Sequence, residues 1–169
     1  MYLLENPDRL PEQKGLSRFH VELRLWHYPS FEPYVAWLLY RHRTEKSCLL
    51  REVVWDKPDE ANRMLNPLEG IKRGFIIKPR FRIRDVEIDK EEIDHRLGEL
   101  QRIEMPVFIE NSAFGLDGES SGIARGNGFL DTRISWWCEG PPEWKTVTSW
   151  FYHTKTYLET QLEKAPPRG

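Results

Sequence analysis

The chain has 169 residues, a length that fits one domain able to bury a sizeable core without disulfide or metal staples. Its 25 Lys and Arg against 27 Asp and Glu give a net charge of −2, so no overall field favours nucleic acid or an anionic membrane. The 12% aromatic content, with seven Trp, predicts a core built from large rings.

The cysteine pattern and the apolar runs indicate in which cellular compartment the protein works and whether it enters a membrane. Cys48 and Cys138 are far apart and have neither a metal-type spacing nor a disulfide framework. The N-terminus lacks a basic segment followed by an apolar run, and no stretch approaches the roughly 20 apolar residues that span a bilayer. We therefore expect a soluble cytoplasmic protein with no membrane partner, no metal and no cofactor.

Residues 1–16 carry several turn signals and few apolar residues, which indicates a loosely attached N-terminal arm to a single domain covering 1–169. A strict alternation follows, with Phe19, Val21, Leu23 and Leu25 predicted to face the core of a half-buried strand.

The next stretches are predicted to form a hairpin. Residues 34–41 are apolar at both odd and even positions. This pattern fits a central strand covered on both faces or a buried helix turn. We favour the strand, because residues 44–47 suit a hairpin loop into a Leu- and Val-rich strand over 48–55. A helix of about two turns is expected after Lys57.

A strand with an arginine stripe and a helix come next. Phe81 and Ile83 alternate with arginines. Asp89 and Glu92 have the spacing of a capping box, and an apolar stripe from Ile93 to about Ile103 then predicts a helix that Pro106 ends.

The C-terminal third predicts a meander and a long helix. Asp117-Gly118 and the glycines near 127 mark turns, and residues 129–137 alternate so that Trp136 faces the core and Trp137 faces away. Two prolines end this strand and introduce a helix from Glu143, whose buried stripe is predicted to contain Val147, Trp150 or Phe151, Thr154, Leu158 and Leu162. The fold class is therefore α+β: a mostly antiparallel sheet of about 6–7 strands with two amphipathic helices packed on one face.

A search for catalytic motifs gives weak signals. The glycines from 118 to 128 lack the Lys-Ser/Thr ending of a phosphate loop, and Asp117 with Glu119 reads more readily as a hairpin tip than as an acid–base pair. Cys138 is expected to be structural. His20 and His27, seven residues apart on one strand, are predicted to point to opposite faces. We therefore assign no catalytic residue.

A candidate partner-binding surface remains on the sheet face away from the helices. Trp, Tyr and Arg are enriched in binding hot spots, and the strand parities bring a set of them together. The set is Arg24, Trp26, Tyr28, Arg80, Arg82, Arg84, Arg133 and Trp137. The alternative is that these arginines stack over outward rings for solubility and cation–π support, or that a loop covers the rings.

The C-terminal third also carries a family resemblance. Leu116-Asp117-Gly118, Arg133-Ile134-Ser135-Trp136-Trp137, Pro142-Glu143-Trp144 and the terminal helix resemble the C-terminal part of small bacterial proteins, some of which act like immunity proteins. The resemblance covers about 50 residues and implies neutralisation of a partner protein by binding.

The sequence thus predicts a non-enzymatic binding module, an immunity-like inhibitor that engages another protein through the aromatic and arginine face. A second copy of the chain is another candidate occupant of that face. Two alternatives stay open. One is an enzyme in which Glu119, Asp117, Asp131 and a histidine meet in a cleft, and the other is nucleic-acid binding through Arg80, Arg82 and Arg84.

Overall fold

The computed structural model describes residues 16, 19–42, 47–56, 80–109, 117–126 and 131–165. The predicted N-terminal arm, apart from Leu16, and the predicted helix after Lys57 lie outside the described residues.

Six antiparallel strands form one sheet in the order β4-β3-β2-β1-β5-β6. The first three make a meander and β4 extends it, whereas β5 and β6 add to the free edge of β1. Their bounds are β1 Phe19–Pro29, β2 Tyr34–His42, β3 Cys48–Trp55, β4 Phe81–Ile88, β5 Glu119–Gly126 and β6 Asp131–Trp137. The strand interpretation of 34–41 is thus confirmed, because β2 is an inner strand.

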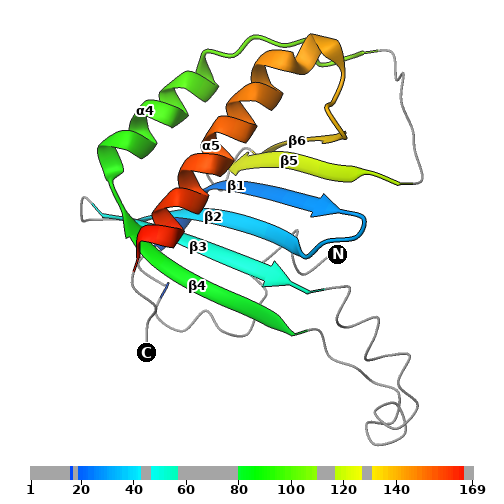
Figure 1. Ribbon diagram of the computed structural model, residues 1–169. Helices are drawn as coiled ribbons and strands as arrows, with labels where there is room; N and C mark the ends of the chain where they lie inside the picture. The colour runs from blue at the N-terminus through cyan, green and yellow to red at the C-terminus, as the bar shows by residue number, and fades with distance from the viewer. Residues whose placement is uncertain are drawn as a thin grey trace, which may run out of the picture.

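Two helices lie on the same side of this sheet (Figure 1). They are α4, Lys90–Gln101, and α5, Lys145–Lys164, which a short 3-10 turn at Pro142–Trp144 introduces. Asp89 caps α4 by accepting a hydrogen bond from the backbone N–H of Glu91. The helix ends at Gln101, before the predicted stop at Pro106, so Ile103 and Met105 belong to the extended segment that leaves it. The α+β class and the one-sided placement of the helices are confirmed.

The main core lies between the sheet and the two helices. The predicted stripe of α5 is buried throughout, and Trp136 packs edge-to-face on Phe151 with ring centroids 5.1 Å apart. The buried members of this core are Leu23, Leu25, Trp37, Leu39, Leu50, Ile93, Leu97, Ile123, Trp136, Val147, Trp150, Phe151, Leu158 and Leu162.

The opposite face of the sheet carries a second apolar cluster. In the part of the chain that the structure describes, no helix covers this face, yet its residues are buried. They are Trp26, Tyr28, Tyr34, Ala36, Leu38, Tyr40, Leu49, Val53 and Ala124. The expectation of an outer face left to solvent is therefore wrong for its aromatic residues.

A β-bulge interrupts the alternation of β1. The pairing with β2 shifts between Val21 and Leu23, so the residues before and after this point change sides. Phe19 and Val21 pack with the second cluster, whereas Leu23 and Leu25 face the helices. The prediction that all four share one face is wrong, because one extra residue in a strand shifts the parity.

Candidate functional site

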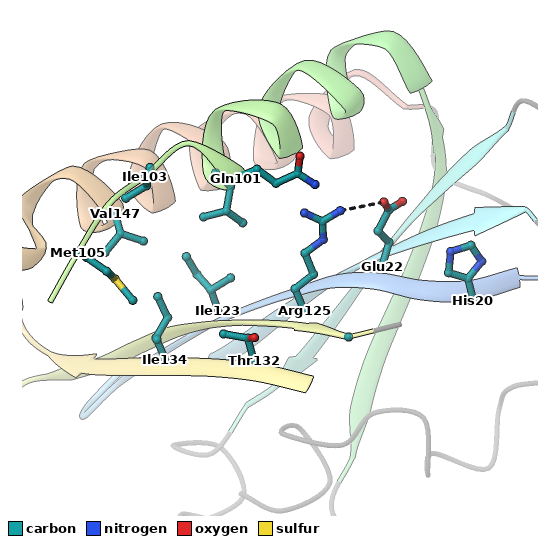
Figure 2. A pocket seen from close by; sticks show the side chains of 12 residues that line it. His20, Glu22, Gln101, Ile103, Met105, Ile123, Arg125, Thr132, Ile134 and Val147 are labelled. Atoms are coloured by element: carbon teal, nitrogen blue, oxygen red, sulfur yellow. Dashed lines mark hydrogen bonds and ion pairs between the residues drawn. The ribbon is translucent and has the colours of Figure 1, made fainter. Parts of the chain in front are cut away.

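A cavity of about 490 Å³ lies between the sheet and the helices, and we call it the sheet–helix pocket. Strands β1, β5 and β6 supply one side, and the end of α4 with the segment that follows it supplies the other (Figure 2). Its lining residues are His20, Glu22, Leu100, Gln101, Ile103, Met105, Ile123, Arg125, Gly126, Thr132, Ile134 and Val147.

Most of the pocket wall is apolar. Ile123 and Ile134 are direct cross-strand partners on β5 and β6, so their side chains stand together on the helix-bearing face. Val147, in the first turns of α5, faces them. Ile103 and Met105 close the opposite side because α4 stops early and the chain continues in extended form over the sheet (Figure 2).

One end of the pocket is charged. The bulge in β1 turns Glu22 toward the helix-bearing face, where it pairs with Arg41 of β2 and, at 3.5 Å, with Nη2 of Arg125. With the Gln101 amide oriented to match its neighbours, its oxygen accepts from Nη1 and Nη2 of Arg125 at 2.8 and 3.2 Å. Arg41 also pairs with Asp94 of α4 at 2.6 Å, so this end fastens α4 to the sheet.

The predicted partner surface is built differently from the expectation. Trp26 and Tyr28 do lie away from the helices, but they are only 4% and 5% exposed. The Trp26 ring lies across Gly122. The guanidinium of Arg133 covers this ring, with its Cζ atom 4.6 Å from the ring centroid. Arg24 is half-buried beside them, and burial lowers its pKa although Asp131 acts against this shift. These rings are therefore interior residues and do not form an exposed patch.

The arginine stripe of β4 is on the wrong side for that surface. Phe81 and Ile83 pack with the second cluster, so Arg82 and Arg84 belong to the helix-bearing face. Arg84 donates to the carbonyl oxygens of Leu162 and Ala165 at the end of α5. Arg84 thus holds the C-terminal end of α5, which is a favourable place for a cation.

The remaining predicted residues are scattered. Arg80 is exposed just before β4, and exposed Arg82 lines a different hollow from the sheet–helix pocket. Trp137 is half-buried, with its ring against Gly118. The structure therefore places Arg24, Trp26, Tyr28 and Arg133 on one face of the sheet and Arg82 and Arg84 on the other.

A polar network at the far end of the helix-bearing face contains residue types found in hydrolases. His27 Nδ1 lies 2.9 Å from Ser121 Oγ, and its Nε2 lies 3.5 Å from Glu119. Tyr152 of α5 donates to Glu119 at 2.6 Å, and burial together with this bond raises the pKa of Tyr152 to about 12. Glu119 thus lies beside a histidine, whereas Asp117 and Asp131 are exposed at other positions, so the four groups of the enzyme hypothesis do not meet.

This network lacks the access that a nucleophilic serine needs. Ser121 is 0% exposed in the middle of β5, so no substrate carbonyl can reach its hydroxyl. Both nitrogens of His27 already face protein partners, and burial lowers the pKa of the imidazole against the opposing effect of Glu119. The arrangement ties α5 to β1 and β5.

His27 also lines a hollow of about 510 Å³. Acidic and basic side chains line the same hollow, among them Glu52, Lys155 and Glu159. Burial raises the pKa of Glu52. The bulge corrects one further expectation, because His20 and His27 both stand on the helix-bearing face, each in its own hollow.

Among the described residues, no group of three His, Cys, Asp or Glu side chains could hold a metal ion. No helix in the described ranges is long and apolar enough to cross a bilayer.

Comparison of the chain with family models, with curated proteins and with solved structures found no match. The function is therefore inferred from the site.

Sequence reasoning missed the residues of the sheet–helix pocket. Glu22 and Arg125 are far apart in the chain, and only the bulge in β1 and the pairing of β1 with β5 bring them together. Ile123 and Arg125 share strand parity, which is a signal that could have placed both on the helix side. Nothing in the sequence indicates that α4 stops short and leaves space below Ile103.

Proposed function

We propose that this protein is a non-enzymatic binding module that holds a small, largely apolar molecule in the sheet–helix pocket. The observation that carries the proposal is a cavity of about 490 Å³ within the main core, apolar over most of its wall and charged at one end. Ligand sites typically measure about 300–1,000 Å³ and combine apolar walls with a few polar groups that fix orientation.

Packing energetics support the proposal. Ile103, Met105 and Ile134 on the pocket wall are half-buried, so each keeps apolar surface that faces the opening. Removing apolar surface from water contributes about 25 cal/mol per Å². A ligand with an apolar body covers this surface, and that gain is a driving force for binding.

The polar lining favours binding over catalysis. Glu22 accepts from two guanidinium groups, so its carboxylate is already engaged. Among the described residues that line the pocket there is no serine, cysteine or lysine, and the hydroxyl of Thr132 has no hydrogen bond to a base there. Cys48 and Cys138 are both free thiols, which fits the reducing cytoplasmic compartment that we include in this proposal.

The test is a titration with an environment-sensitive apolar fluorophore. Ile134→Phe adds volume inside the pocket, so it should weaken binding of the probe by about tenfold or more. Ser135→Phe is the matched control, because Ser135 is the exposed neighbour on the opposite face of β6. Equal binding by both variants and the parent protein would place the probe outside the pocket and contradict the proposal.

A second candidate function is the neutralisation of another protein, as the immunity-like resemblance implies. Val107 and Phe108 are 76% and 95% exposed on the segment after α4, and adjacent exposed apolar side chains are typical of partner surfaces. If this segment binds a protein, Phe108→Ser should abolish co-purification of that partner and leave the fluorophore titration unchanged. Phe31→Ser, at an exposed turn elsewhere, is the control.

A further inference from the structure

We infer that the ligand of the sheet–helix pocket is an anionic amphiphile, an aliphatic carboxylate in its simplest form, whose head group binds Arg125. This inference rests on the proposed function and adds the chemistry of the ligand.

The charged end of the pocket belongs to a chain of ion pairs that extends beyond its lining. The ion pairs connect Glu22 and Asp94 with Arg41, Lys90 and Arg125 in one chain of contacts. Among the described residues, this chain holds two carboxylates and three cations, of which Glu22 and Arg125 line the pocket. His20 is exposed at the same end.

Arg125 is the cation that the chain of ion pairs satisfies least. Arg41 makes close contacts with both Glu22 and Asp94, and Lys90 pairs closely with Asp94. Among the described residues, Arg125 reaches only Glu22, at 3.5 Å, and the neutral amide of Gln101. It also lines the pocket with 31% of its side chain exposed, against 17% for Glu22. The reachable charge at this end is therefore the guanidinium.

Arg125 keeps free donors for the head group. A guanidinium has five N–H groups in a fixed plane. Gln101 takes one from each Nη atom and Glu22 takes the second of Nη2. Among the described residues, the Nε–H and the outer N–H of Nη1 stay available, and because they lie on opposite edges of the plane a carboxylate accepts from one of them at a time. Charge-assisted bonds of this kind are stronger than neutral ones and give a head group its orientation.

The apolar body of such a ligand has a defined direction. In Figure 2 the guanidinium of Arg125 lies toward Glu22 and Gln101, and the side chains of Ile134, Met105 and Val147 lie toward the other end of the pocket. A chain that starts at Arg125 therefore runs along β5 and β6 below the segment that follows α4 (Figure 2).

The test compares three probes of equal chain length, below their micelle concentrations: decanoate, decanol and decyltrimethylammonium. Calorimetric titration at pH 7.5 should show decanoate binding at least about tenfold more tightly than decanol, a factor equivalent to about 1.4 kcal/mol. The quaternary ammonium should bind more weakly than decanol, because Arg125 repels it. Arg125→Met should remove the preference for decanoate and retain decanol binding. Arg133→Met, on the neighbouring strand and the opposite face, should change neither affinity.

The outcomes separate this inference from the proposed function. Equal affinity for decanoate and decanol in the parent protein would overturn the anionic head group and leave the binding module standing. Tighter binding of the ammonium probe would assign the head-group role to Glu22 and overturn the inference. Failure of all three probes to bind would contradict both statements. The parent comparison decides the matter even if Arg125→Met does not fold.

Discussion

Gly122 packs directly under the ring of Trp26, and this packing requires a residue without a Cβ atom. A Cβ at this position would lie 2.1 Å from the Trp26 ring and 2.7 Å from the carbonyl oxygen of Ile134. The ring cannot swing away freely, because Arg133 covers its other side. The backbone of β6 cannot yield without breaking its pairing with β5.

We therefore expect Gly122→Ala to destabilise the protein by about 1–3 kcal/mol, the usual cost of overpacking. Gly98→Ala is the matched control, since nothing lies within 4 Å of its Cβ position inside α4. That change should stabilise the helix by about 0.5–1 kcal/mol. Urea denaturation of both variants measures the difference. Similar effects of the two substitutions would show that Trp26 does not occupy the space above Gly122.

His27 makes the free energy of unfolding depend on pH. Burial lowers its pKa in the folded state below the unfolded value of about 6.5, so the unfolded chain takes up the proton more readily. Stability is then fully present above about pH 6.5 and falls as the pH drops through that value toward the folded pKa. Glu119, Glu159 and Glu32 oppose the shift, and Lys155 adds to it.

Denaturant unfolding at intervals between pH 7.5 and 5.5 measures this effect. His27→Gln should flatten the pH dependence over that range, and His153→Gln, an exposed change on α5, should leave it as in the parent protein. Parallel curves for the parent protein and His27→Gln would show that His27 titrates as in the unfolded chain.

At the level of elements, strand β6 shows how far side-chain alternation can be read from a sequence. Alternation correctly assigns Trp136 to the helix side, where it is 5% exposed. It also sends Trp137 to the other face, but it cannot reveal that the ring rests against Gly118. In β1 the same rule fails at Glu22, because a bulge depends on the pairing partner and leaves no mark in the strand's own pattern.

The two tryptophans give the corresponding prediction. Trp136→Ala removes a ring that packs on Phe151 and should cost about 3–5 kcal/mol. Trp137→Ala removes a half-buried ring and should cost about 1 kcal/mol. Guanidinium melts of the two variants provide the comparison. An equal, large loss for both would mean that β6 is packed as tightly on its outer face as on its inner face.

Helix α5 could be read from the sequence almost completely, because its stripe repeats every three or four residues over 20 residues. Helix α4 was predicted with its capping aspartate but with too long a C-terminal end. Propensity allows the helix to continue past Gln101. In the structure Ile103 instead packs against the main core from an extended segment. Tertiary packing thus ends α4 at Gln101, and this early end leaves room for the pocket.

For the whole molecule, composition and hairpin-length connections were enough to predict a two-layer α+β fold with both helices on one face. They could not predict the sheet–helix pocket. A pocket is the volume left when elements meet, and here it depends on one bulge, one early helix end and the pairing of β5 with β1. Alternation also could not predict that Trp26 is 4% exposed, with its ring over Gly122 and beside the guanidinium of Arg133.

The central claim is that the sheet–helix pocket binds a small apolar molecule. A methyl-selective NMR titration with decanol tests it most directly. We predict saturable shift changes that share one dissociation constant at Ile103, Met105, Ile123, Ile134 and Val147. Methyl groups of Leu38 and Val53, buried on the opposite face of the sheet, should stay unchanged. Shifts confined to Leu38 and Val53, or no saturable change at any pocket methyl group, would contradict the account.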